Sequence, residues 1–140
     1  MKRADKVNIA FFSDSCEVFE SIPREVYAAC DVRWVSSYTK TSTLGNQNPP
    51  SLIILDTYSL GMDFLALLSN ASQWQCPVLV LDHYTERLFI EDILNKGARG
   101  YLLVHSFEEE LSSAIRHLLN GEAYVSYLLE VYKGNTYLLK

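Results

Sequence analysis

The chain has 140 residues, which is the size of a single domain, so we expect one hydrophobic core. Hydrophobic residues make up 49% and charged residues 21% of the chain, a balance that is typical of globular proteins and excludes disordered and fibrous classes. Seventeen acidic against twelve basic residues give a formal net charge of -5, which opposes non-specific binding to nucleic acid or anionic lipid.

Five short apolar runs predict the strands of a parallel sheet. Continuous apolarity over so few residues is typical of strands that are buried on both faces. Four of the runs stop at a polar residue, and the weakest of the five is the second. The predicted strands are residues 7–12, 32–35, 52–55, 78–81 and 101–104.

Segments with a helical spacing of apolar residues lie between these runs. The helix after Ser15 is interrupted by Pro23, which removes a backbone donor, so we expect this helix to kink or to begin again there. Ser106 with Glu109 forms a capping-box pattern before the most regular helix, and Gly121 predicts its end. The other segments are predicted helices at 62–69, 85–96, 106–120 and 124–132, and a predicted loop at 39–50.

The alternation of strand and helix predicts an α/β fold, with a parallel sheet covered by helices on both faces. In such sheets, ligands bind at the edge where the carboxyl ends of the strands meet. The polar residues expected at that edge are Asp14, Asp56, Asp82 and His105. We therefore expect any chemistry of this chain to involve these side chains.

Other reactive residues form no recognisable site. The cysteines are odd in number and lack a C-x-x-C pair, which predicts reduced core thiols, and the histidines lack metal-ligand spacing. No nucleophile elbow, phosphate loop or zinc motif is present, so we expect no enzymatic activity. The apolar runs are shorter than the roughly 20 residues that span a bilayer, and the basic start lacks a signal-peptide core, which predicts a cytoplasmic protein without a membrane partner. The cysteines of the chain are Cys16, Cys30 and Cys76, and its histidines are His83, His105 and His117.

More than half of the chain closely resembles receiver domains of the LuxR/NarL class of response regulators. The matching stretches are Leu52-Ile53-Ile54-Leu55-Asp56 with Gly61-Met62-Asp63, then Cys76-Pro77-Val78-Leu79-Val80-Leu81, then Lys96-Gly97-Ala98-Arg99-Gly100-Tyr101-Leu102-Leu103, and Gly121-Glu122-Ala123-Tyr124. The resemblance implies a flavodoxin-like, CheY-like fold, which is a doubly wound sheet of five parallel strands in the order 2-1-3-4-5. We expect the receiver-like domain to span residues 1–122, and residues 123–140 to form an extra C-terminal helix or linker.

The resemblance also implies roles for five positions. In the family, a phosphoacceptor aspartate attacks the phosphoryl group, two acids hold Mg²⁺, and a hydroxyl and a lysine bond the phosphoryl oxygens. Asp56 stands at the phosphoacceptor position, and Asp14 stands at the second acidic position, whereas the first is Ser13. The hydroxyl position is Asp82 and the lysine position is Val104.

These departures predict that Asp56 is not usefully phosphorylated. Val104 supplies no counter-ion, and Asp82 places a carboxylate where the family binds an anionic phosphoryl group. Removing one group that stabilises transition-state charge typically costs roughly 3 to 4 kcal/mol. Two interpretations of the acidic pocket of Asp14, Asp56 and Asp82 remain open. It is either a weak Mg²⁺ or Ca²⁺ site, with Asp14 and Asp56 as metal ligands, or a family remnant without a cofactor.

The tail and one helix predict association between copies of the chain. Regulators of this class continue into a basic helix-turn-helix module, so we expect DNA binding only through an output domain beyond Lys140. Asp82, Tyr101 and Val104 are the expected switch positions. The alternative interpretation of Tyr101 is an aromatic side chain that is packed in the core. The interface candidates are Leu88, Phe89, Tyr101, Tyr124, Tyr127 and Tyr132. The alternative interpretation of the tail tyrosines is that they cover the edge of the core.

The tail also resembles that of the biofilm and curli regulators of the LuxR group, some of which bind cyclic di-GMP at a motif ending in arginine. Here Tyr127 stands in place of the arginine, which removes its charge and guanidinium plane, so we expect no cyclic di-GMP binding. We therefore predict an atypical receiver of a LuxR-type transcription regulator that signals by phosphorylation-independent homodimerisation. The alternatives are a phosphoaccepting receiver that uses Asp56, Mg²⁺ and a sensor kinase, and a regulator that responds to cyclic dinucleotides.

Overall fold

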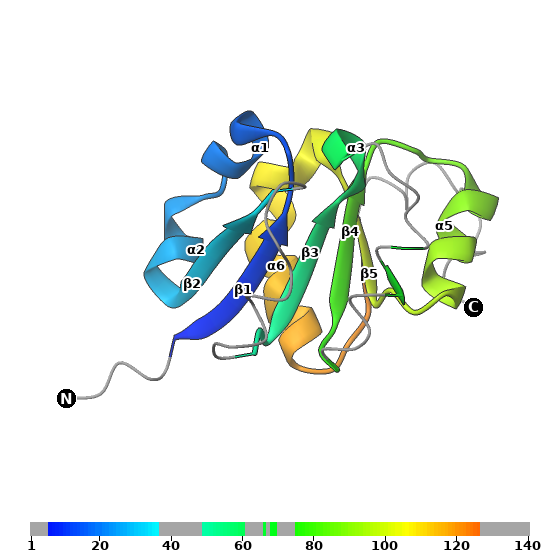
Figure 1. Ribbon diagram of the computed structural model, residues 1–140. Helices are drawn as coiled ribbons and strands as arrows, with labels where there is room; N and C mark the ends of the chain where they lie inside the picture. Colours follow the sequence, from blue (N-terminus) through cyan, green and yellow to red (C-terminus); the bar gives the residue numbers. More distant parts are fainter. Residues whose placement is uncertain (1–5, 37–48, 61–65, 67, 70–74, 127–140) are drawn as a thin grey trace.

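A computed structural model of the chain describes residues 6–36, 49–60, 66, 68–69 and 75–126. Within them, six parallel strands form one sheet in the order β2-β1-β3-β4-β5-β6 (Figure 1). The strands are β1 (Val7–Phe12), β2 (Cys30–Val35), β3 (Leu52–Asp56), β4 (Val78–Asp82), β5 (Gly100–Leu103) and β6 (Tyr124–Val125). The predicted α/β class and the order 2-1-3-4-5 are confirmed, and a sixth strand extends the sheet beyond β5.

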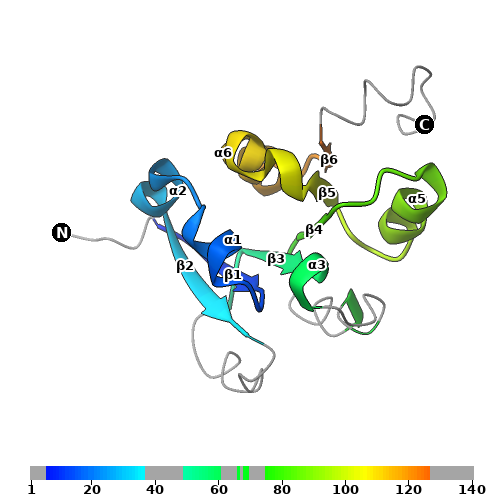
Figure 2. The same ribbon diagram turned by 90° about the horizontal axis from the view of Figure 1, so that it is seen from above.

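Helices cover both faces of this sheet. They are α1 (Cys16–Glu20), α2 (Arg24–Ala29), α3 (Thr57–Leu60), α5 (Arg87–Asn95) and α6 (Phe107–Leu119), with a short 3-10 turn, η3 (Val104–Ser106). Figure 2 shows α1, α2 and α6 on one side of the sheet and α5 on the other. Two apolar clusters result, one between the sheet and α2 and α6, the other between the sheet and α5.

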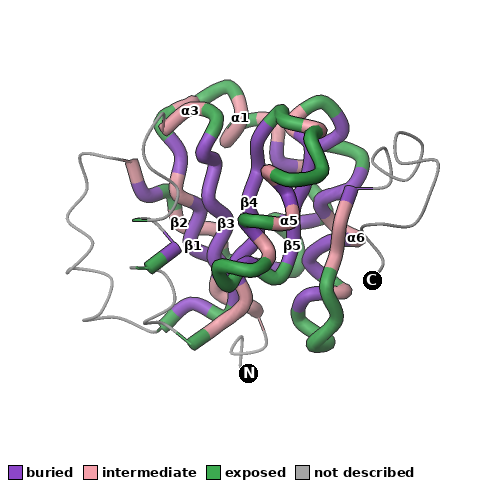
Figure 3. Tube along the Cα trace, turned by 90° about the vertical axis from the view of Figure 1, so that its right-hand side faces the viewer, coloured by how far each residue is buried: buried purple, intermediate pink, exposed green. Residues whose placement is uncertain are grey.

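The central strands are the most deeply buried part of the chain. Every residue of β3 and of β4 is buried, which explains their continuous apolar sequence (Figure 3). In the parallel register, Phe12 lies opposite Leu55, and Asp56 lies opposite Leu81. The carboxyl ends of β1, β3 and β4 therefore meet at one edge, and this edge carries the predicted pocket.

The predicted interruption of the first helix is confirmed. The Oγ of Ser15 accepts a hydrogen bond from the backbone N–H of Val18 and so begins α1, which ends at Glu20. The chain then restarts as α2 directly after Pro23, where the fixed proline φ favours a first helical turn. Gly121 has a φ of +85°, a left-handed conformation that ends α6 as predicted.

Two predictions about the ends of α6 and the tail are wrong. The side chain of Ser106 makes no cap hydrogen bond to α6, because it instead donates to the carboxylate of Glu110. Tyr124 and Val125 form β6 rather than the start of a helix, because their backbone pairs with β5. Residues 127–132 of the predicted tail helix, most of the helix predicted at 62–69 and most of the loop predicted at 39–50 lie outside the described residues.

The three thiols are free, but they do not all lie in the core as predicted. Cys30 is buried and Cys76 is half-buried, whereas Cys16 is exposed at the start of α1. Burial raises the pKa of the Cys76 thiol to about 11. In the described part of the chain, no helix combines the length and the apolarity needed to cross a membrane.

Candidate functional site

Asp56 lies at the end of β3 at the centre of the strand-end pocket, and its side chain is fully buried. The hydroxyl of Ser13, at the end of β1, donates to Oδ2 of Asp56 at 2.7 Å. The backbone N–H of Ser59 donates to the other carboxylate oxygen at 3.2 Å. Both oxygens of the phosphoacceptor position are therefore already hydrogen-bonded within the chain.

Ser59, in α3, contacts the residues that follow β1. Its hydroxyl accepts a hydrogen bond from the backbone N–H of Asp14 at 2.9 Å, and it lies 3.2 Å from the Oγ of Ser13. Asp14 itself is exposed, in contrast to the buried Ser13. Ser59 was not among the residues predicted from sequence, although its position three residues after Asp56 is that of a residue one helical turn beyond a strand end.

Asp82 lies at the end of β4 and is also buried, with 5% of its surface exposed. The hydroxyl of Thr57 donates to Oδ2 of Asp82 at 2.5 Å, and the backbone N–H of His83 donates to Oδ1 at 2.8 Å. The Nδ1 of His83 lies 3.0 Å from the same oxygen. At the position where the family has a hydroxyl, this chain therefore has a carboxylate that the residue after Asp56 holds in place.

The position that corresponds to the lysine of the family does not lie in a strand. Val104 belongs to η3 rather than to the predicted end of the fifth strand, and its side chain packs partly buried against the core. The neighbouring His105 is exposed. At this position the chain supplies an apolar contact to the core in place of the lysine ammonium group.

Tyr101 is the largest fully buried side chain. Its hydroxyl donates to the backbone carbonyl of Tyr84 at 2.7 Å, in the loop that follows Asp82. Burial raises the pKa of Tyr101 well above its usual value, and the nearby Asp82 carboxylate raises it further. Tyr101 therefore joins β5 to the pocket loop, and its side chain has no exposed surface in this structure.

The acids of the predicted pocket do not converge on one point. Asp56 and Asp14 are linked through Ser59, and Asp82 is bonded to Thr57, the neighbour of Asp56. Among the described residues, no three His, Cys, Asp or Glu side chains are grouped so that they could hold a metal ion. Ser13, which stands at the first acidic position of the family, supplies a hydroxyl that donates to Asp56 in place of a carboxylate. These residues do not fit the complete Mg²⁺ site of the family.

The other interface candidates differ in exposure. Leu88, on α5, has 75% of its surface exposed, and Phe89 packs partly buried against the core. Tyr124 is half-buried in β6. Tyr127 and Tyr132 lie outside the described residues. Ser126, the residue before Tyr127, is fully buried, and its hydroxyl donates to Glu110.

A run of aromatic rings extends from the mouth of the pocket to β5. The ring of His83 lies between those of Tyr58 and Tyr84, with centroid distances of 4.9 and 4.2 Å. Phe89 follows, 4.5 Å from Tyr84 and 6.3 Å from Tyr101. Tyr58 and Tyr84 are 54% and 41% exposed and His83 is exposed, so the part of this run from Tyr58 to Tyr84 is accessible, whereas Tyr101 is fully buried.

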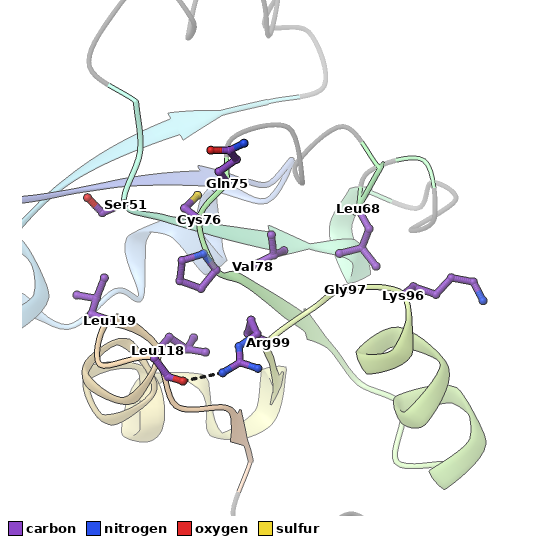
Figure 4. A pocket seen from close by; sticks show the side chains of 12 residues that line it. Ser51, Leu68, Gln75, Cys76, Val78, Lys96, Gly97, Arg99, Leu118 and Leu119 are labelled. Carbon is purple, nitrogen blue, oxygen red and sulfur yellow. Dashed lines mark hydrogen bonds between the residues drawn. The ribbon is translucent and has the colours of Figure 1, made fainter.

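A separate cavity of about 610 Å³ lies at the opposite edge of the sheet, before the first residues of β3, β4 and β5 (Figure 4). Its wall is mainly apolar and includes Val78 and Leu118. Figure 4 shows Lys96 extending away from the cavity, where its ammonium bonds Asp92, while the guanidinium of Arg99 donates to the carbonyl of Gly121. This cavity is therefore not part of the strand-end pocket.

Comparisons with known proteins agree with the resemblance seen in the sequence. The chain is 29% identical over 73 residues to the transcriptional regulatory protein DesR of Bacillus subtilis, a match that covers 52% of this chain and 37% of DesR. It spans less than two fifths of the length of the curated relatives that it matches. No model of a known protein family matches the chain.

Two solved structures show the same fold. The isolated REC domain of RcsB from Salmonella enterica serovar Typhimurium matches with a TM-score of 0.71 and 17% identity, over 93% of this chain and all of that one. The signal receiver domain of the putative response regulator NarL from Mycobacterium tuberculosis matches with a TM-score of 0.65 and 19% identity, over 84% of this chain and 99% of that one. These two likenesses show that the chain has the fold of a response-regulator receiver domain, and the sequence relatives that it matches are regulatory proteins.

Proposed function

We propose that this receiver signals by association with a second copy of itself, independently of phosphorylation, as part of a LuxR-type transcription regulator. One observation carries the proposal, which is that the strand-end pocket is already satisfied by hydrogen bonds. Asp56 is bonded to Ser13 and Ser59, and Asp82 is bonded to Thr57 and His83. In the described part of the chain, no buried side-chain nitrogen or oxygen lacks a hydrogen-bond partner.

A phosphoryl group on Asp56 would meet two unfavourable changes. It would break the hydrogen bond that Ser13 donates to Asp56. It would also place about two negative charges next to β4, the neighbouring strand, which ends in the buried Asp82. Val104 provides no cation to offset this charge. Because a group of this kind contributes roughly 3 to 4 kcal/mol in catalytic sites, its loss opposes both the transfer and the product.

The exposed surface of α5 supports the association. Leu88 is largely exposed, and Tyr84, in the loop before α5, is 41% exposed. Burying a leucine side chain contributes about 2 kcal/mol, and aromatic residues are enriched at the centres of protein interfaces. In this proposal, the DNA contacts belong to a separate output module of the regulator.

Intact-mass measurements after incubation with Mg²⁺ and acetyl phosphate test the phosphorylation part. We expect no phosphoryl adduct on the wild type. The matched variant carries Ser13→Asp, Asp82→Thr and Val104→Lys, which restores the family residues, and we expect it to gain an adduct that Asp56→Asn removes. A stoichiometric adduct on the wild-type chain that is lost in Asp56→Asn would refute the proposal.

Light scattering coupled to size exclusion tests the association part. Without a phosphodonor, we expect a dimer that Leu88→Asp weakens at least tenfold in Kd, because about 2 kcal/mol of apolar burial is lost. The control is Asn95→Asp, which adds the same charge at another exposed position of α5. A wild-type monomer at every accessible concentration would contradict the proposal.

A phosphoaccepting receiver is the second candidate function, and one observation favours it. The carboxylate of Asp56 lies at the carboxyl end of a central strand, and Ser59 links it to the backbone of the exposed Asp14. A metal ion would have to displace the hydroxyl of Ser13 from Asp56. The mass measurement on the wild-type chain separates this function from the first.

A further inference from the structure

A buried carboxylate away from the strand-end pocket joins α6 to β6. Glu110 lies in the first turn of α6, and only 3% of its surface is exposed. The hydroxyls of Ser106 and Ser126 donate to its Oε2 at 2.5 and 2.6 Å, and the hydroxyl of Tyr124 donates to its Oε1 at 2.5 Å. We propose that Glu110 is a latch that holds residues 124–126 in the sheet and so fixes the direction in which the chain leaves the receiver.

The sixth strand is too short to be held by its backbone alone. It has two residues, both half-buried, that pair with β5, and the backbone bonds that flank this short ladder run from Tyr124 N–H to the Arg99 carbonyl and from Ser126 N–H to the Tyr101 carbonyl. A strand of this length has little ladder and little apolar burial to stabilise it. Hydrogen bonds to a carboxylate are stronger than those between neutral groups, so the Glu110 cluster supplies what the strand lacks.

The polar character of the cluster points to specificity rather than to general stability. Ser126 is fully buried, and burying a hydroxyl is unfavourable unless it is hydrogen-bonded. Its Oγ meets both Glu110 and, at 3.1 Å, Ser106. An apolar side chain at position 110 would be buried at lower cost, but it would bond none of these hydroxyls and would not select one position for Ser126.

The latch lies next to the residue at the switch position. Tyr101 accepts the backbone hydrogen bond of Ser126 through its carbonyl, and it donates through its hydroxyl to Tyr84 in the loop after Asp82. Release of β6 would therefore remove a polar contact from the residue that also holds the pocket loop. The latch does not depend on whether Asp56 accepts a phosphoryl group.

Hydrogen exchange at single amides tests the latch. We expect Glu110→Ala and Ser126→Ala each to accelerate exchange of the Tyr124 amide, and Glu110→Ala to accelerate the Ser126 amide, at least tenfold. The amide of Ile53, which donates to the Pro77 carbonyl at 3.0 Å in the centre of the sheet, should stay protected. The control variant is Glu108→Ala, which removes an exposed acid from the same turn of α6.

Two results would overturn the latch. The first is unchanged exchange at Tyr124 in both variants. The second is an equal loss of protection at Ile53, which would mean that Glu110 stabilises the whole domain rather than β6. If Glu110→Ala does not fold, Ser126→Ala still decides the question, because it removes one hydroxyl and leaves the carboxylate in place.

Discussion

The hydroxyl of Tyr101 leads to a prediction about stability and pH. We expect the wild type to be more stable than Tyr101→Phe at pH 8, and this difference to disappear as the pH rises. Tyr101→Phe removes the hydrogen bond to the Tyr84 carbonyl and leaves the buried ring in place. A neutral hydrogen bond contributes about 0.5 to 1.5 kcal/mol. Because this hydrogen bond is only partly buried, we expect a loss near the lower end, about 0.5 to 1 kcal/mol, at pH 8.

At high pH the pKa of Tyr101 works against the wild type. Burial raises this pKa in the folded chain, so the folded state keeps its proton at a pH where the unfolded tyrosine, with a pKa near 10, loses it. Stability from this group is complete below about pH 10 and falls by up to about 1.4 kcal/mol per pH unit above it. At pH 11 the wild type has therefore lost about 1.4 kcal/mol that Tyr101→Phe has not, and the variant equals or exceeds it in stability.

Urea unfolding of both proteins from pH 8 to 11, followed by circular dichroism, measures the two effects together. The other tyrosines titrate in both proteins, so their contributions cancel in the difference. Parallel stability curves, with the same gap at pH 8 and pH 11, would show that Tyr101 is not held in its neutral form by burial.

Three shorter predictions concern the pocket, β6 and the thiols. Thr57→Val removes the donor to the buried Asp82 carboxylate and should cost about 1.5 to 3 kcal/mol in urea unfolding, while Thr57→Ser should retain most of that energy. A Cβ at Gly100 would lie 3.0 Å from a backbone oxygen of β6, so Gly100→Ala should cost about 1 to 3 kcal/mol in thermal unfolding. At pH 8, a pKa of about 11 leaves about one Cys76 thiolate in a thousand, so mass mapping after brief alkylation should find Cys16 labelled first.

The sequence predicts the central part of the fold because local pattern and burial agree there. Both β3 and β4 are buried over their whole length, so their apolar runs follow directly from their place in the sheet. Pro23 acts on its own neighbours, and its interruption of the helix is equally local. The tail differs, because Val125 belongs to a helical spacing of apolar residues in the sequence but pairs with β5, and no local pattern reports a long-range partner such as Glu110.

The candidate site divides in the same way. Asp56 and Asp82 are found from sequence because each directly follows an apolar strand. Their hydrogen-bond partners are not found, because the hydroxyls of Ser13, Thr57 and Ser59 belong to no periodic pattern that would mark them. Only adjacency offers a signal, since Thr57 and His83 directly follow the two acids, and side chains next to a strand end share its edge.

A phosphorylation switch needs hydroxyl groups that are free to move towards a new anion. In this pocket, the hydroxyls already donate hydrogen bonds to other groups. Ser13 donates to Asp56, Thr57 donates to Asp82, and Tyr101 donates to the loop between them and α5. A phosphoryl group would have to break the first of these bonds without gaining a lysine. The proposed signal therefore uses other contacts, those of the exposed surface of α5 and those of the buried latch that holds β6, and we place it in association and in the outgoing chain rather than at Asp56.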